Sequence, residues 1–233
     1  TLEAEAVGAV ALAETRALWK AERHVPQGTI SSDPVRPRLV VLIAVDQLRG
    51  DYLQTFRPYF GEGGFRRFVE QGAVFTQAMF DHGTTKTCPG HAVVSTGAQP
   101  ADHGIVANNW WNSASRRVEY CAYDPGSPLV GGEGEGRSPR NLAAPTFGDV
   151  LRLSNGGQSR VVAVAGKDRS AIMLGGRLAN AAYWPVGTSF VTSRYYADAL
   201  PDWVRRFNDS GTFERYLGKA WEKVLPEEAY ALQ

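Results

Sequence analysis

Thr87 is a residue whose type and neighbours suggest chemistry. It lies in the stretch GTTKTCPGH, residues 83–91, where Pro89 suits the first turn of a helix because its missing N–H needs no partner there. The residues that follow predict a short helix that ends at Gly97. Thr87 is therefore expected at or beside the helix N-cap, where its hydroxyl group either caps the helix or meets an anion. The stretch alone favours the cap, because threonine is a common N-cap residue.

Charged residues follow two apolar runs that are typical of buried strands. Asp46 follows LVVLIAV, residues 39–45, and the triplet Lys-Asp-Arg, residues 167–169, follows SRVVAVA. A carboxylate that ends a buried strand needs a partner or a metal ion, although a capping or loop aspartate is the simpler interpretation. Lys167 and Arg169 could bind one anion, with Arg169 bidentate, or form a solvated charged turn.

Two further polar residues are ambiguous when taken singly. Asn108 precedes Asn109 and two tryptophans, where it either forms a turn or donates its side-chain amide to a phosphate oxygen. His91 lies four residues after Thr87 and thus on the same helix face. Its apolar neighbours favour a hydrogen-bonded core histidine over a ligand.

The elements that must position these residues alternate between strands and helices. Besides the two apolar runs, the pattern predicts helices after Asp51, before Gly72 and before Asn155, and a strand over residues 73–80. This alternation predicts an α/β fold with a mostly parallel central sheet covered by helices on both faces. Ligands bind such sheets at the carboxyl ends of the strands, which is where Asp46 and residues 167–169 fall.

The chain divides into an arm and one large domain. Residues 1–38 predict an N-terminal helix and a Pro-rich arm, and residues 39–233 predict the α/β domain. Within it, residues 98–144 read as a loop insertion whose GGEGEG stretch could partly cover a site. Residues 200–233 predict two short helical stretches.

Composition excludes several classes of function. The formal net charge is +1 and no basic block is present, so neither nucleic acid nor an anionic membrane is an expected partner. The apolar runs are too short to span a bilayer, and no signal peptide is visible. Cys88 and Cys121 match no zinc spacing, and their count fits one disulfide or two free thiols. Val94 lies six residues after Cys88, at the position where a phosphotyrosine phosphatase needs its phosphate-binding arginine.

Taken together, three stretches resemble the first half of the PafA-type alkaline phosphatases, members of the alkaline phosphatase superfamily. They are VLIAVDQLRGDYL, TTKTCPGHAVVSTGAQPADHGIVANNWW and AGKDRSAIML, and the resemblance runs from about residue 38 to the C-terminus. It implies that Asp46 is a zinc ligand and that Thr87 is the nucleophile and a second metal ligand. It also implies that Asn108, Lys167 and Arg169 contact the phosphoryl oxygens. The resemblance therefore favours a nucleophile over a cap at Thr87.

The resemblance implies a zinc-dependent phosphate monoester hydrolase that forms a phosphothreonine intermediate on Thr87 and uses two zinc ions in the full-length enzyme. Small phosphate monoesters would be its substrates, and a periplasmic or secreted location is implied. An exported enzyme favours oxidation, so we expect a disulfide between Cys88 and Cys121. Pro89 follows Cys88 directly, which departs from the Cys-x-Pro-x-Arg pattern of sulfatases.

Two alternatives stay open. One is a phosphodiesterase or nucleotide pyrophosphatase of the same superfamily, and the other is a non-catalytic domain without complete metal sites. The chain has four histidines, and none of them matches a ligand position of the family: His24, His82, His91 and His103. We therefore expect an incomplete metal site and no activity of this chain alone. We also expect its strands to expose an unpaired edge or an apolar face where the rest of the domain would pack. The oligomeric state is left open.

Overall fold

The computed structural model describes residues 37–230 and consists of two compact units, Thr1–Ile43 and Ala44–Gln233. The predicted N-terminal helix lies outside the described residues. Residues 37–43, the described part of the first unit, form neither helix nor strand, and Leu39 is 78% exposed. The strand predicted over residues 39–45 is therefore wrong for this structure. A strand needs a ladder of hydrogen bonds, and none of the described strands pairs with this run.

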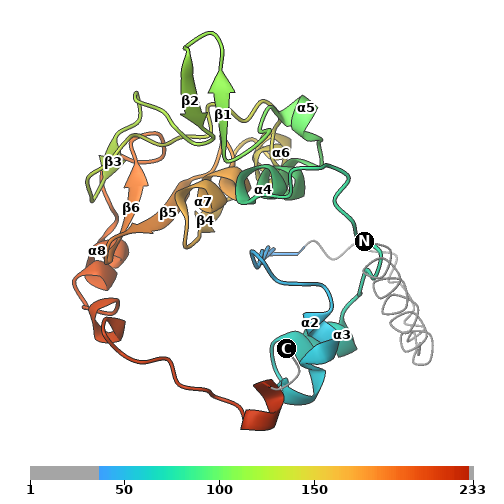
Figure 1. Ribbon diagram of the computed structural model, residues 1–233. Helices are drawn as coiled ribbons and strands as arrows, with labels where there is room; N and C mark the ends of the chain where they lie inside the picture. Colours follow the sequence, from blue (N-terminus) through green and yellow to red (C-terminus); the bar gives the residue numbers. More distant parts are fainter. Residues whose placement is uncertain (1–36, 231–233) are drawn as a thin grey trace. The chain divides into compact units, whose positions relative to one another are not determined.

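The second unit contains the helices and strands that build the site (Figure 1). In chain order the α-helices are α2 (Tyr52–Thr55), α3 (Phe65–Gln71), α4 (Thr87–Thr96), α5 (Pro100–His103), α6 (Phe147–Ser154), α7 (Asp168–Gly175) and α8 (Asp202–Asn208). The strands are β1 (Asn109–Asn112), β2 (Arg117–Tyr120), β3 (Leu129–Val130), β4 (Val162–Val164), β5 (Ala181–Val186) and β6 (Ser189–Ser193). Short 3-10 helices span Arg57–Tyr59, Glu214–Tyr216 and Glu227–Tyr230.

The main sheet has the strand order β3-β6-β5-β4, and only its β4–β5 pair is parallel. The α/β class is confirmed, and the sheet of the described residues is mixed rather than mostly parallel. Side chains of β5 alternate between two apolar clusters. Ala182 and Trp184 belong to the cluster that includes residues of α4 and α7, whereas Ala181 and Tyr183 pack with Leu200 and with Val204 of α8. Helices therefore cover both faces of β5, as predicted.

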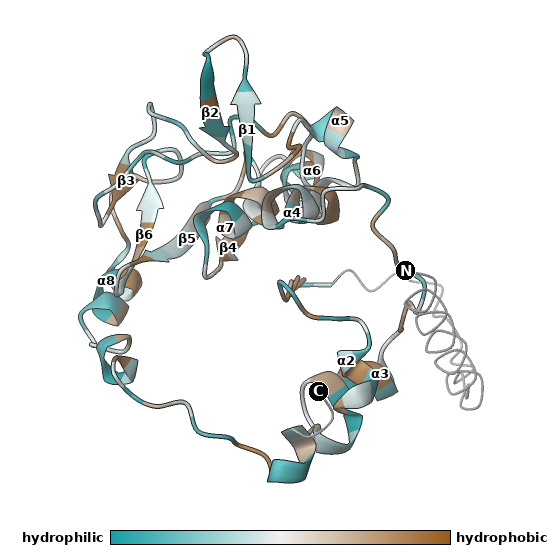
Figure 2. Ribbon diagram, viewed as in Figure 1, coloured by the Kyte–Doolittle hydropathy of each residue, from teal (hydrophilic) through white to brown (hydrophobic). Residues whose placement is uncertain are grey.

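Strand β4 forms one edge of this sheet. Its Val162 and Val164 side chains are 56% and 58% exposed, and no other strand in the described part of the chain pairs with its free edge. The predicted strand at this position is confirmed, but it is not buried on both faces. The expected unpaired edge is present, and Figure 2 shows its apolar colouring together with that of residues 39–45.

Two helices underlie the candidate site. The predicted stop of α4 is confirmed at Gly97, whose φ of 67° lies in the left-handed region that favours glycine. Helix α4 packs on α7 through buried residues of both helices, and the Ser95 hydroxyl donates to the Met173 carbonyl at 2.7 Å. Since α7 also packs on β4 and β5, the sheet fixes both helices.

Other predicted elements had mixed outcomes. The stops of α3 at Gly72 and of α6 at Asn155 are confirmed, and a Thr146–Asp149 capping box fixes the start of α6. The strand predicted over residues 73–80 is wrong, because this segment is irregular and exposes Phe75 and Met79. No helix among residues 37–230 is long and apolar enough to cross a bilayer.

Residues 98–144 are more than a surface loop. Strands β1 and β2 form an antiparallel hairpin in which Asn109 pairs with Tyr120. Four apolar residues of this segment are fully buried in the main core: Ile105, Cys121, Ala122 and Leu142. The segment therefore holds its Asn108 and Tyr120 on a packed scaffold.

Candidate active site

Thr87 is the first residue of α4, and the N-cap position belongs to Lys86. No side chain caps this helix, so capping is not the role of the Thr87 hydroxyl group. Instead, Thr87 Oγ1 donates to Asp46 Oδ2 at 3.2 Å. The Thr87 carbonyl accepts a hydrogen bond from His91 Nδ1 at 2.7 Å, and the His91 side chain is buried. His91 is thus a hydrogen-bonded core histidine that supports the first turn of α4.

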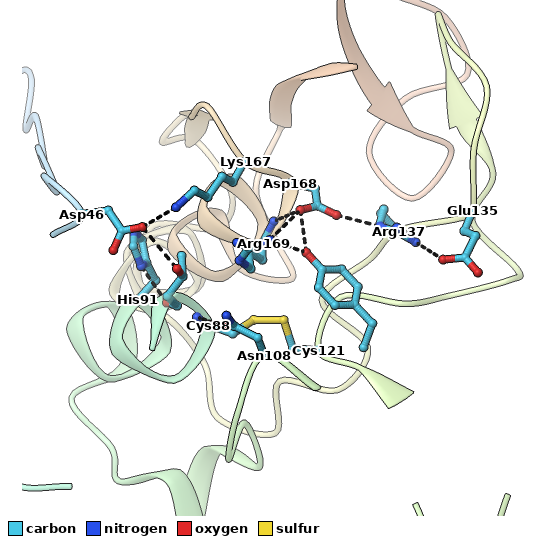
Figure 3. Close-up of polar contacts among 12 residues, drawn as sticks. Asp46, Cys88, His91, Asn108, Cys121, Glu135, Arg137, Lys167, Asp168 and Arg169 are labelled. Carbon is cyan, nitrogen blue, oxygen red and sulfur yellow. Dashed lines mark hydrogen bonds and ion pairs between the residues drawn. A yellow bond between two sulfur atoms is a disulfide. The ribbon is translucent and has the colours of Figure 1, made fainter. Parts of the chain in front are cut away.

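Asp46 joins Thr87 to Lys167. Its Oδ2 atom accepts from Lys167 Nζ at 2.6 Å as well as from the Thr87 hydroxyl group. The hydrogen bond from Lys167 is the main reason that the pKa of Asp46 lies below its usual value. The two side chains are 31% and 42% exposed, so water partly screens their attraction. The structure thereby brings together three predicted site residues from distant parts of the sequence (Figure 3).

Asn108 is fixed by hydrogen bonds at both ends. Its Oδ1 atom accepts from the Cys88 N–H at 2.8 Å, and its backbone carbonyl accepts from the Cys121 N–H at 2.9 Å. The same two cysteines form a disulfide bond, with their Cα atoms 6.6 Å apart. No acceptor for the Asn108 side-chain NH2 group exists among the described residues. That group is therefore available to donate to an anion beside Thr87.

Arg169 follows Lys167 on the first turn of α7. Its Nη1 atom donates to the Tyr120 hydroxyl oxygen at 3.2 Å, and its Nε atom is buried without a partner in the described part of the chain. The carboxylate of the intervening Asp168 accepts from the Tyr120 hydroxyl group at 2.6 Å and from Arg137 Nε at 2.7 Å. Asp168 therefore points away from Lys167 (Figure 3).

A pocket of about 450 Å³ adjoins these cations. Lys167, Asp168 and Arg169 line it, together with Glu133 and Glu135 of the GGEGEG stretch. Pro185 and Val186 at the end of β5 also line it. The pocket therefore lies at the carboxyl ends of the parallel pair β4 and β5, as expected for a ligand site in an α/β sheet.

The donors of this site suit a phosphoryl group. Figure 3 shows Asp46, Lys167 and Asn108 near the first turn of α4, with Arg169 beside them. An ammonium group, a guanidinium group and an amide N–H can hold phosphoryl oxygens, where negative charge accumulates during phosphoryl transfer. The hydroxyl group of Thr87 is the nucleophile candidate among them.

The Asp46 carboxylate and the Thr87 hydroxyl group are oxygen donors of a kind that zinc accepts. A tetrahedral zinc site needs at least three protein ligands. Within residues 37–230, however, no three His, Cys, Asp or Glu side chains are grouped closely enough to hold a metal ion. His103, for example, is fully buried, and its Nδ1 accepts from the Ile105 N–H at 3.1 Å. The described residues thus fit part of a zinc site.

Sequence reasoning missed two residues that build this site, Tyr120 and Arg137. Both contact Asp168 from the segment that was interpreted as a loop insertion. Nothing local to either residue signals this role, because the contacts cross 48 and 31 positions of the sequence. Only the position of Tyr120 directly before Cys121 placed it near the expected disulfide.

Comparisons with known proteins agree with this geometry. The family model described as type I phosphodiesterase / nucleotide pyrophosphatase matches residues 40–230. A protein of Myroides odoratus named calcium-transporting ATPase is 38% identical over 201 residues, which are 84% of this chain and 37% of that protein. Alkaline phosphatase PhoV of Synechococcus elongatus is 37% identical over 215 residues, which are 91% of this chain and 39% of PhoV.

A crystal structure of alkaline phosphatase PafA matches the fold. It is 35% identical in sequence, with a TM-score of 0.75, over 78% of this chain and 36% of the PafA chain. The chain thus spans less than two fifths of the length of these relatives.

Proposed function

Because the chain belongs to the type I phosphodiesterase / nucleotide pyrophosphatase family, we propose that the protein is a zinc-dependent phosphate monoester hydrolase with Thr87 as its nucleophile. Membership confirms the predicted resemblance to the alkaline phosphatase superfamily, and relatives named alkaline phosphatase support hydrolysis of phosphate esters. The assignment of monoesters, of zinc and of Thr87 is our proposal.

One observation carries the proposal. Asp46 Oδ2 contacts both the Thr87 hydroxyl group at 3.2 Å and Lys167 Nζ at 2.6 Å. One oxygen atom of the Asp46 carboxylate thus accepts hydrogen bonds from both the proposed nucleophile and a cation. A hydroxyl group that served only as a helix cap would instead bind backbone N–H groups of α4.

The residues support a two-step reaction. The Thr87 oxygen attacks phosphorus, the new Thr87 O–P bond forms, and the bond from phosphorus to the alcohol oxygen breaks. The proton of the Thr87 hydroxyl group leaves, and the alcohol takes up a proton. Water then cleaves the phosphothreonine and releases inorganic phosphate. Lys167, Arg169 and the Asn108 NH2 group hold the non-bridging oxygens in both steps.

Within residues 37–230, Asp46 and Thr87 are the residues that would hold zinc. A bound zinc ion would lower the pKa of the Thr87 hydroxyl group and offset charge at phosphorus. Asp46 is a weak base, because Lys167 holds its pKa low. Because Asp46 alone would activate the Thr87 hydroxyl group poorly, we propose that the enzyme requires two zinc ions. Since residues 37–230 group too few ligands, the other ligands would come from outside these residues.

The family description favours a second candidate, a phosphodiesterase or nucleotide pyrophosphatase. A diester carries one negative charge fewer than a monoester dianion and needs fewer cations. Lys167 and Arg169 together favour the dianion, which is why the monoester is proposed first. A third candidate, a domain without catalysis, is supported by the lack of a complete metal-binding group within residues 37–230.

The experiment compares substrates on the whole gene product, purified with zinc. We expect turnover of p-nitrophenyl phosphate to exceed turnover of bis-p-nitrophenyl phosphate, and chelation of zinc to abolish both. ATP is included because one relative is named an ATPase. Faster diester turnover would favour the second candidate, and the absence of turnover on every ester would favour the third. Phosphate trapped on Thr87, detected by mass spectrometry of acid-quenched enzyme, would identify the nucleophile.

We also propose that the protein is periplasmic or secreted and acts on small phosphate esters, without nucleic acid or a membrane as partner. The Cys88–Cys121 disulfide supports an oxidising compartment. The net charge of +1 gives no support for a polyanionic partner.

A further inference from the structure

The Tyr120 hydroxyl group lies between two charged groups of α7. It donates to Asp168 Oδ1 at 2.6 Å and accepts from Arg169 Nη1 at 3.2 Å. Arg169 Nη1 and Asp168 Oδ1 are 3.9 Å apart, which is too far for a good hydrogen bond. The hydroxyl group thus takes the place of a direct hydrogen bond between these neighbours.

Arg137 holds the other side of Asp168. Its Nε atom donates to Asp168 Oδ2 at 2.7 Å, and its guanidinium carbon lies 4.9 Å from the centre of the Tyr120 ring. The Arg137 and Asp168 side chains are 18% and 16% exposed, so solvent screens this pair only in part. Asp168 Oδ1 also accepts from the Arg169 backbone N–H at 2.7 Å. The carboxylate is therefore held on several sides.

This arrangement leaves one edge of the Arg169 guanidinium group unused. Nη1 is bound to Tyr120, whereas neither Nε nor Nη2 has a partner within residues 37–230. The Nε atom is buried, and a buried N–H group without an acceptor is unfavourable. The edge formed by Nε and Nη2 presents two parallel N–H donors, the arrangement that binds two oxygens of one phosphoryl group.

We propose that Tyr120, Asp168 and Arg137 are positioning residues that hold Arg169 by Nη1 and so direct its Nε–Nη2 edge at the phosphoryl group. The inference rests on the proposed function, because it assigns that edge to the same phosphoryl site. Without the Tyr120 hydroxyl group, Arg169 Nη1 can approach Asp168 directly, and the free edge turns away from the substrate. The aromatic ring of Tyr120 is left to pack as before.

The test is Tyr120→Phe in the whole, zinc-loaded enzyme, alone and combined with Arg169→Ala. Tyr123→Phe is the matched control, because Tyr123 is half-buried, contacts Arg117 through its ring and makes no described side-chain hydrogen bond. Losing one direct oxyanion donor lowers activity about 100- to 1,000-fold, so we expect Tyr120→Phe to lower monoester kcat/KM by roughly 10- to 100-fold. In the Arg169→Ala background the same change should have less than about a 2-fold effect.

Diester turnover and phosphate affinity distinguish positioning of Arg169 from a purely structural role of Tyr120. Tyr120→Phe should lower diester kcat/KM less than monoester kcat/KM. Arg137→Met should likewise lower the ratio of monoester to diester kcat/KM. The proposal is overturned if Tyr120→Phe acts equally in both backgrounds, or if it matches Tyr123→Phe. If the wild-type protein hydrolyses no ester, the proposed function fails. Calorimetric binding of inorganic phosphate then decides whether Tyr120→Phe weakens the anion site only when Arg169 is present.

Discussion

Cys88 and Cys121, joined by a disulfide bond, directly follow the proposed nucleophile Thr87 and the positioning residue Tyr120 in the sequence. Asn108 accepts one hydrogen bond from the backbone of each cysteine. The bond thereby links the first turn of α4 to the end of β2. A single covalent link thus holds the proposed nucleophile Thr87, Asn108 and Tyr120 in one arrangement.

Replacing both cysteines with alanine should lower stability and activity together. The bond closes a loop of 33 positions, and the chain-entropy model assigns it roughly 3–4 kcal/mol of unfolding free energy. Urea unfolding of the oxidised wild type and of the double variant measures this difference. Dithiothreitol should destabilise the wild type and leave the double variant unchanged. Equal unfolding free energies in the wild type and the variant would show that the bond does not hold the fold together.

Thr87→Ala should abolish monoester hydrolysis in the whole enzyme and leave the fold intact. Removing a covalent nucleophile typically lowers kcat by about 10⁴-fold or more. The Thr87 side chain makes no cap, so the unfolding free energy should change by less than about 1 kcal/mol. Thr85→Ala, at an exposed position two residues earlier, is the control and should be fully active. An active Thr87→Ala enzyme would exclude the proposed mechanism.

Lys167→Met and Arg169→Met should each harm monoester hydrolysis more than diester hydrolysis. The dianion gains more from each cation, so we expect monoester kcat/KM to fall by about 10²- to 10³-fold and diester kcat/KM by clearly less. Lys86→Met, an exposed lysine beside Thr87, removes the same charge and should be nearly neutral. Equal losses on both substrates would contradict the claim that this pair selects monoesters.

Asp124 should make stability depend on pH in the acid range. Burial raises the pKa of its carboxyl group. Hydrogen bonds from Ser138, Ser127 and the Gly126 N–H together lower this pKa by more than burial raises it, so the net pKa lies below 3.8. The stabilisation is therefore complete above about pH 3.8 and is lost as the pH falls through the lower folded-state pKa. Urea midpoints measured from about pH 6 down to pH 2 should show a smaller decline in Asp124→Asn than in the wild type. Parallel curves would mean that Asp124 has no such role.

Local sequence signals predicted α4 and α6 but not α7, the other helix that underlies the site. Pro89 lies in the first turn of α4 and Gly97 ends it, and Asn155 ends α6, as the sequence predicted. The charged triplet after β4 was also placed at the correct edge of the sheet. These signals act over one or two turns, which is why they can be read from the chain.

Strand pairing and the contacts of Asp168 could not be predicted in the same way. Residues 39–45 have the composition of a buried strand, yet a strand forms only when a partner edge is available. The strand predicted over residues 73–80 is wrong for the same reason. The Tyr120–Asp168 contact joins residues 48 positions apart, and no local pattern encodes it. Family resemblance supplied the site residues, and the residues that hold them required the structure.

Zinc binding by the 233-residue chain should be weak and limited by Lys167. Complete structural zinc sites bind with about 10–16 kcal/mol, whereas the described residues offer only Asp46 and Thr87. The Lys167 ammonium group is 2.6 Å from Asp46 Oδ2 and competes with a metal ion for that oxygen. We therefore expect Lys167→Met to strengthen zinc binding and Asp46→Asn to remove it.

Calorimetric titration of the chain with zinc measures both effects, with Lys86→Met as the control for the lost charge. We expect this chain alone to hydrolyse no p-nitrophenyl phosphate at any zinc concentration, because two ligands hold the ion neither tightly nor in a fixed position. Tight, stoichiometric zinc in the wild-type chain, or measurable turnover, would mean that further ligands lie within these 233 residues. Weaker binding in Lys167→Met would mean that Lys167 supports the metal site instead of competing with it.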